Sequence, residues 1–323
     1  MQVCGHRPIS GECPEPVFAS EISIPAETNI SEAIRKIFQS SFQHAMANLP
    51  VYLQTGHIES VHQLRVGLRR FRAGMSAFSP ILDLKRPAGL TMQMKLIFDD
   101  LGPIRDADVF LDETLEAILK LGLPSSYEAM LREEITDYRQ KKYEAVKKTL
   151  ESTRFERFIV DMNAWIDSDQ WFRFERPIDQ LIRQRSIGTF AESRLADMNL
   201  KLLKLGGRAE NGNLDDWHRL RIMTKKIRYA SEPLLSIVGG KQSRKYTKSL
   251  SRLQQTLGKI NDLNSISRFL HDVAENLDRR KASEFKEASA FCIGWGAASA
   301  DAAVAELLPS WHKFSKTAED IWS

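Results

Sequence analysis

The 323-residue sequence has few cysteines and no long hydrophobic run. Its three cysteines, Cys4, Cys13 and Cys292, are too few and too scattered to form a disulfide framework, which favours a reducing compartment. The N-terminus lacks the basic region followed by an apolar run that marks a secretory signal. No apolar stretch approaches the ~20 residues needed to span a bilayer. We therefore expect a cytoplasmic protein with no membrane partner.

The alternating pattern that is typical of β-strands is also missing. From Ser31 onward nearly every segment has helical periodicity, and prolines and glycines separate the segments, among them the pair Gly102-Pro103. The predicted fold is all-α, with helices over about 31–54, 58–80, 89–101, 104–121, 125–151, 153–168, 177–205, 214–237, 241–258, 260–278, 280–299 and 302–321.

The predicted organisation is a leader followed by two helical units. Residues 1–28 show no periodicity, so we expect a loosely ordered leader. Its Cys4, His6 and Cys13 are too few ligands on a flexible segment to predict a metal site. The apolar periodicity is interrupted between residues 167 and 177, which predicts helical bundles over about 29–170 and 177–323, each burying its own apolar stripes.

Two segments contain no acidic residue. No Asp or Glu occurs between Glu59 and Asp83 or between Asp216 and Glu232, and these segments carry nine Lys or Arg side chains in a chain whose net charge is +4. Surface helices usually interleave acids with bases at a spacing of four residues. Like charges on successive turns destabilise a helix unless an anion offsets them. The pattern therefore indicates an anion-binding surface more strongly than a solvated face.

The two acid-free segments repeat one pattern 156 residues apart. The first reads His62-x2-Arg65-x3-Arg69-Arg70-x-Arg72, and the second reads His218-x2-Arg221-x3-Lys225-Lys226-x-Arg228. Because each residue of an α-helix advances by ~100°, the histidine and three of the basic residues of each copy form one stripe opposite an apolar face. The repeat predicts an internal duplication that has kept this cationic stripe. We interpret both histidines as ligands of anionic oxygen and not as catalytic bases.

The same offset relates Leu101-Gly102-x-Ile104-x-Asp106 to Leu257-Gly258-x-Ile260-x-Asp262. We expect both aspartates near the first turn of a new helix, where a carboxylate is stabilised by free N–H groups, or beside a basic side chain that they hold in position. Only one carboxylate of the set Asp99, Asp100, Asp106 and Asp108 is repeated in the second half, which argues against a two-metal catalytic site.

These residues resemble the CHAD family, the conserved-histidine α-helical domain. The resemblance rests on the first basic stripe, on Leu101-Gly102-x2-Arg105-Asp106-x-Asp108-Val109 and on Lys226-x-Arg228-Tyr229-x2-Glu232. It extends from about residue 29 to the end of the chain, through Arg154-Phe155-x2-Phe158, Trp165, Gly294-Trp295, Trp311-x2-Phe314 and Trp322.

The resemblance implies two pseudo-symmetric four-helix bundles whose basic helices face each other across a central groove or pore. It also implies non-enzymatic binding of inorganic polyphosphate, with sulfate or phosphate able to occupy the site, and association with polyphosphate granules. No cofactor and no metal is implied. At the matching positions the binding residues are His62, Arg65, Arg69, Arg70, Arg72, Lys95, His218, Arg221, Lys225, Lys226, Arg228, Arg244, Lys245, Lys248 and Arg252.

Two departures from the family pattern matter. Lys225 and Lys226 stand where the family prefers arginine, so the second stripe offers point charges in place of planar forks. The Glu-x-Glu-x-Lys strand of the triphosphate-tunnel domains often fused to the family does not occur, which leaves no catalytic partner in this sequence.

Alternatives to polyphosphate binding remain. The stripes could bind the phosphate backbone of a nucleic acid, although no aromatic residue interleaves with their cations to stack on bases. A metal-dependent phosphohydrolase would use His62 or His218 with Asp106. Homodimer formation, the preferred chain length and the choice between a pore and a groove are left open by the sequence.

Overall fold

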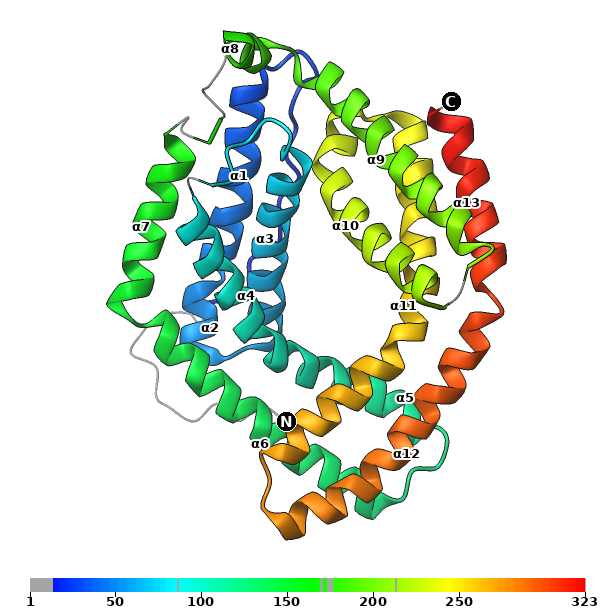
Figure 1. Cartoon of the computed structure of the whole chain (residues 1–323). Helices are drawn as coiled ribbons and strands as arrows, with labels where there is room; N and C mark the ends of the chain where they lie inside the picture. The colour runs from blue at the N-terminus through cyan, green and yellow to red at the C-terminus, as the bar shows by residue number, and fades with distance from the viewer. Residues whose placement is uncertain (1–13, 86, 169–170, 173–176, 213, 323) are drawn as a thin grey trace.

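The computed structural model describes residues 14–85, 87–168, 171–172, 177–212 and 214–322. Every regular element in these ranges is helical, which confirms the predicted all-α fold (Figure 1). Extended pairing within them is limited to two isolated bridges, between Asn29 and Ser186 and between Leu82 and Phe172. In the part of the chain that the structure describes, no helix is both long and apolar enough to cross a membrane.

The helices of the two halves follow the same order. The first half contains α1 (Ile30–Ala47), α2 (Leu49–Thr55), α3 (Ile58–Ala77), α4 (Ala88–Val109), the π-helical turn η1 (Phe110–Thr114), α5 (Leu115–Leu119), α6 (Ser125–Leu150) and α7 (Thr153–Asp167). The second contains α8 (Pro177–Gln184), α9 (Ile187–Ala209), α10 (Leu214–Val238), α11 (Gly240–Glu275), α12 (Arg279–Val304) and α13 (Leu307–Trp322).

A shift of 156 residues places α1, α3, α4, α6 and α7 over α9, α10, α11, α12 and α13 in turn. The helix order therefore follows the repeat in the sequence. The duplication itself stays a prediction.

The position of α3 is set by a close approach to α1. A Cβ atom on Gly67 would lie 2.6 Å from the backbone nitrogen of Ala45, so only a hydrogen fits between the two helices at this point. Beside it, the rings of Phe38 and Phe71 stack with their centroids 4.8 Å apart. Because this face of α3 is buried against α1, its basic stripe points to the other side.

The two halves share their hydrophobic cores. One cluster of buried side chains, here called the upper core, contains Phe71 of α3, Leu250 of α11 and Trp311 of α13. The lower core contains the end of α4, η1, α5, part of α6, the end of α11 and α12, and in it the rings of Phe110 and Phe269 lie 5.5 Å apart. The expectation that each half buries its own apolar stripes is therefore wrong, because α4 and α11 each reach into both cores.

Two predicted helix breaks do not occur. α4 continues through Gly102-Pro103, and α11 continues through Gly258. Proline removes one backbone donor from a helix, but the helix persists where other contacts hold the turn; here Arg65 Nη1 donates to the carbonyl oxygen of Phe98, about one turn earlier (2.6 Å). Figure 1 shows both long helices bending as they pass from the upper to the lower core.

Two other predicted helices are each divided. The predicted helix over 31–54 is split at Asn48, between α1 and α2, and the one over 177–205 is split at Arg185-Ser186, between α8 and α9. At both breaks the segment before α1 takes part in the hydrogen bonding. Asn48 binds the backbone of Val17, and the Ser186 hydroxyl donates to the carbonyl oxygen of Ala26 (2.6 Å). The sequence pattern does not reveal these contacts, because their partners lie far along the chain.

The described part of the leader is packed against the helices. The Asn48 side chain donates to the carbonyl oxygen of Val17 and accepts from its N–H, both at 2.9 Å. The N–H of Gly188 donates to the carbonyl oxygen of Ala26 (2.9 Å), and Ile24 is buried in the upper core. The expectation of a loosely ordered leader is thus wrong from residue 14 onward, because backbone hydrogen bonds and an apolar anchor hold the segment.

Candidate functional site

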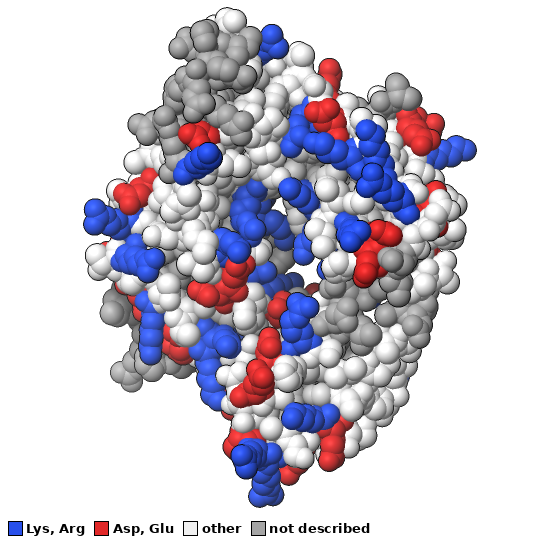
Figure 2. All heavy atoms as spheres, in the orientation of Figure 1, with Lys and Arg blue, Asp and Glu red and all other residues white. Residues whose placement is uncertain are grey.

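The two acid-free segments lie on α3 and α10, and these helices pack against each other at the centre of the molecule. Each turns an apolar stripe toward the upper core, with Leu64 and Leu68 on α3 and Leu220 and Ile227 on α10. The basic stripes of α3 and α10 therefore face the centre of the molecule. Figure 2 shows a hollow at the centre of this face, with Lys and Arg side chains gathered around it.

Tyr229 brings cations of the two halves together. The guanidinium carbon of Arg69 lies 4.7 Å from the centroid of the Tyr229 ring, and that of Arg228 lies 4.5 Å from it. An aromatic face stabilises a nearby cation, which offsets part of the repulsion between the two arginines. Burial raises the pKa of Tyr229, but Arg69, Arg228 and Lys225 outweigh that effect and leave its pKa lowered. The surroundings of the Tyr229 ring are therefore cationic on balance.

Phe98 on α4 holds two further arginines of α3. Arg65 lies 4.2 Å and Arg72 5.0 Å from the centroid of its ring, and Arg65 also donates to its carbonyl oxygen. The sequence stripes contain no aromatic residue, yet the fold places Phe98 and Tyr229 against them. Guanidinium groups pack on both rings, which leaves less aromatic surface for stacking on bases than interleaved exposed rings would offer.

His62 sits among these cations. Burial lowers the pKa of its imidazole, Arg105, Arg69 and Arg65 lower it further, and Glu59 opposes them. The lowered pKa favours the neutral imidazole, which can still donate a hydrogen bond. A bound anion would favour its protonated form. Arg105 belongs to the Leu101-Gly102-x2-Arg105-Asp106 motif, but its place beside His62 was not among the predicted binding positions.

Asp106 lies within α4, so the predicted N-terminal position is wrong. Burial raises the pKa of its carboxyl group, and Arg65, Arg105 and Lys225 oppose the rise. Cations of both halves surround the Asp106 carboxyl group, which fits the alternative that it holds basic side chains in position. Asp262 likewise lies inside a continuous helix, α11, and its side chain is outside the described part of the structure.

Glu232 is a second carboxylate at this surface. Arg228 Nη1 donates to it at 3.1 Å, and Arg228 Nε donates to Gln254 of α11. Burial raises the pKa of Glu232, against the charges of Arg228, Arg69 and Arg70. The spacing of four residues between Arg228 and Glu232 could have identified the pair in the sequence. The contact with Gln254 could not be found there, because it joins two helices.

Two arginine nitrogens of α3 have no acceptor in the described part of the structure. Arg69 lies beside Tyr229, whereas Arg70 lines a separate cavity together with Glu21 and Ile24. Arg69 Nε and Arg70 Nη1 are buried and make no hydrogen bond to any residue that the structure describes. An unsatisfied buried donor costs about 1–3 kcal/mol, and more when the group is charged. An anionic oxygen would remove that cost.

The remaining predicted cations are dispersed. His218, Lys225 and Lys226 are exposed along α10, Arg221 is half-buried there, and Lys95 is exposed on α4. On α11, Arg244, Lys248 and Arg252 line one cavity together with Arg228 of α10. Lys245 turns away from this cavity toward α13, where its Nζ lies 3.9 Å from Asp320 Oδ2.

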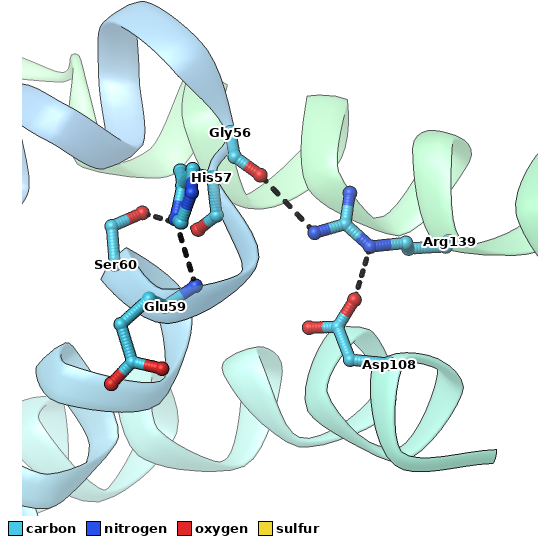
Figure 3. A network of polar contacts seen from close by, with 6 residues as sticks. All are labelled: Gly56, His57, Glu59, Ser60, Asp108 and Arg139. Carbon is cyan, nitrogen blue, oxygen red and sulfur yellow. Dashed lines mark hydrogen bonds and ion pairs between the residues drawn. The ribbon is translucent and has the colours of Figure 1, made fainter. Parts of the chain in front are cut away.

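A buried ion pair holds the start of α3. Arg139 of α6 donates from Nε to the fully buried Asp108 of α4 and from Nη2 to the carbonyl oxygen of Gly56 (3.1 Å), as Figure 3 shows. Gly56 ends α2 with a φ of +59°, which favours glycine. His57 then caps α3 by accepting from the N–H of Glu59 (3.1 Å). This network fixes the helix that carries His62 relative to α4 and α6.

The described part of the structure contains no candidate metal centre. No group of three or more His, Cys, Asp or Glu side chains there could hold a metal ion. Of the four aspartates considered as a cluster, Asp108 pairs with Arg139. Cys4, His6 and Cys13 lie outside the described residues.

Comparison with known proteins gives one family. The CHAD domain model matches residues 36–271. The crystal structure of the CHAD domain from the plant Ricinus communis is similar over 92% of this chain and 96% of that chain, with a TM-score of 0.77 and 26% sequence identity. PptA from Streptomyces chartreusis shares the fold over 88% of this chain and all of that chain, with a TM-score of 0.60 and 16% identity. No curated protein matches the sequence.

The family model covers well over half of the chain, and its range includes α3, α10 and the basic residues described above. The protein belongs to the CHAD domain family.

Proposed function

We propose that this protein binds inorganic polyphosphate without chemically changing it. The binding site would be the central surface, formed by the basic residues of α3, α10 and α11 around Tyr229. The observation that carries the proposal is the convergence at Tyr229: arginines of both halves meet there, and Arg69 Nε is buried without an acceptor among the described residues. A linear polyanion with a charge on every unit would bind such closely spaced donors. Its oxygens would supply hydrogen-bond acceptors for these donors.

The central surface matches polyphosphate better than a nucleic acid. Phe98 and Tyr229, the two aromatic residues that contact the arginines, are packed against guanidinium groups, and a base-free polyanion needs no stacking surface. Asp106 and Glu232 offset part of the positive charge, and Glu232 accepts a hydrogen bond from Arg228. We therefore expect submicromolar, salt-dependent binding of long polyphosphate and weak binding of single phosphate or sulfate, because affinity comes from many simultaneous ion pairs.

The test is a titration with polyphosphates of graded length at two salt concentrations, using the wild type and the double variant Arg69→Glu, Arg72→Glu. Each phosphate contact contributes about 0.7–0.9 to the salt slope, so losing two contacts should weaken binding roughly thirtyfold at 0.1 M salt. The matched control is Arg279→Glu, Arg280→Glu, which makes the same charge change at the exposed start of α12 and should leave the affinity nearly unchanged. Circular dichroism checks that both variants keep their helicity.

Two results would contradict the proposal. Equal affinity for polyphosphate and for an RNA of the same charge would point to general recognition of phosphate backbones. Release of phosphate from polyphosphate in the presence of magnesium or manganese, lost on substitution of His62, would identify a phosphohydrolase.

A further inference from the structure

A second cavity lies next to the central surface, between α11 and α13. It is lined from α11 by Lys245, Lys248 and Arg252 and from α13 by Ser310, Lys313 and Thr317. Its volume is about 200 Å³, several times the ~30 Å³ that one water occupies in the liquid. No Asp or Glu lines it among the described residues, although the chain as a whole carries 42 of them.

The two cavities meet along one helix. Lys248 and Arg252 line both the cavity that contains Arg228 and the cavity that contains Lys313. These two residues are four positions apart on α11, so they stand on the same face of the helix about 6 Å apart along its axis. Cations therefore continue from α10, across α11, to α13.

Asp320 does little to neutralise this surface. Asp320 approaches Lys245 only to 3.9 Å, and both side chains are more than half exposed. An exposed ion pair of this kind contributes at most about 1 kcal/mol. Two hydroxyl groups of the lining already donate to protein acceptors, Ser310 Oγ to Thr256 Oγ1 (3.2 Å) and Thr317 Oγ1 to the backbone carbonyl oxygen of Lys313 (2.9 Å), so the charged donors of the lining are its lysine and arginine groups.

We propose that the cavity between α11 and α13 is an extension site, in which Lys313 and its neighbours hold a distal segment of the polyphosphate chain bound at the centre. This inference rests on the proposed function. A flexible polyanion suits the site, because lysine ammonium groups act as mobile point charges that do not demand one orientation of the phosphate. A polyphosphate chain long enough to reach both cavities gains affinity from the second one, because the entropy of association is lost only once. A short oligophosphate occupies only one cavity.

The experiment measures the affinity of tripolyphosphate and of long-chain polyphosphate for the wild type and for Lys313→Glu, at two salt concentrations. Lys316→Glu is the matched control: it makes the same charge change on an exposed position of α13, three residues away, but Lys316 does not line the cavity. For Lys313→Glu we expect a loss of about fivefold to tenfold for the long chain at 0.1 M salt, a salt slope lower by about one, and an unchanged tripolyphosphate affinity. Lys316→Glu should change neither affinity by more than about twofold.

Each other outcome has a separate meaning. Equal losses in the two variants would show that only the overall charge matters and would overturn the extension site. An equal loss for short and long chains in Lys313→Glu would overturn it too, because Lys313 would then belong to the primary site. If the wild type binds neither polyphosphate, the proposed function fails, and the extension site fails with it.

Discussion

His62 shows how its surroundings set the chemistry of a residue. In water a histidine has a pKa near 6.5. Burial and three arginines lower the pKa of His62, with only Glu59 in opposition. The same arginines that would attract an anion thus favour the neutral form of this imidazole.

This gives a pH dependence with a defined sign. Phosphate oxygens near His62 favour its protonated form, so its pKa is higher in the complex than in the free protein. Binding then takes up a proton, and affinity for long-chain polyphosphate should rise as the pH falls through the interval between the two pKa values. Isothermal titration between about pH 5 and pH 8 in wild type and His62→Gln measures the effect.

Other titratable groups also contribute to the pH dependence of binding, and a control variant separates their contribution from that of His62. Asp106 and Glu232 also have raised pKa values and remain in the variant, so the difference between the two proteins isolates His62. His271→Gln, at an exposed position near the end of α11, should behave as the wild type does. An identical pH dependence in wild type and His62→Gln would exclude the imidazole from the site.

At the level of elements, packing decides where helices run and how closely they approach. α4 and α11 cross predicted breaks at Pro103 and Gly258, because they are held on both sides of the break by different cores. The local sequence at Pro103 and at Gly258 favours the end of a helix. Tertiary contacts outweigh the loss of one hydrogen bond or the cost of about 1 kcal/mol for a helical glycine.

Two adjacent glycines of α9 give a test of this packing. A Cβ atom on Gly206 would lie 1.9 Å from the Trp311 ring of α13, whereas one on Gly207 would meet nothing within 4 Å. We expect Gly206→Ala to lower the free energy of unfolding by about 1–3 kcal/mol, since the buried ring must shift. Gly207→Ala should raise it by about 0.5–1 kcal/mol through helix propensity. Urea denaturation of both variants measures the difference, and equal effects would show that α13 does not pack against α9 as described.

For the whole molecule, the shared cores determine how the protein unfolds. Neither half has a hydrophobic core of its own, because each cluster of buried side chains contains residues of both. We expect a single calorimetric transition whose calorimetric and van't Hoff enthalpies agree. Leu131→Ala, at a fully buried position of the lower core, should lower the midpoint of that one transition at a cost of about 2–5 kcal/mol. A second transition, or a shift of only part of the signal, would show that the cores unfold independently.

The sequence by itself determined the helical class, most helix positions and both basic stripes, because these depend on periodicity and charge within a single helix. It also placed Arg69 and Arg72 on one face, as the distance of three residues requires. The meeting of α3 with α10 was expected from the resemblance to the family and not from the residues.

Only the tertiary structure decided what surrounds those stripes. Phe98 contacts Arg65, Gln254 accepts from Arg228, and Lys313 lines the cavity between α11 and α13, each from a helix that no sequence pattern links to the arginines. Burial and the pKa of His62 likewise follow from helices that meet in space. The physical reason is that a helix specifies its own faces, whereas the partner of each face is selected by how all the helices pack together.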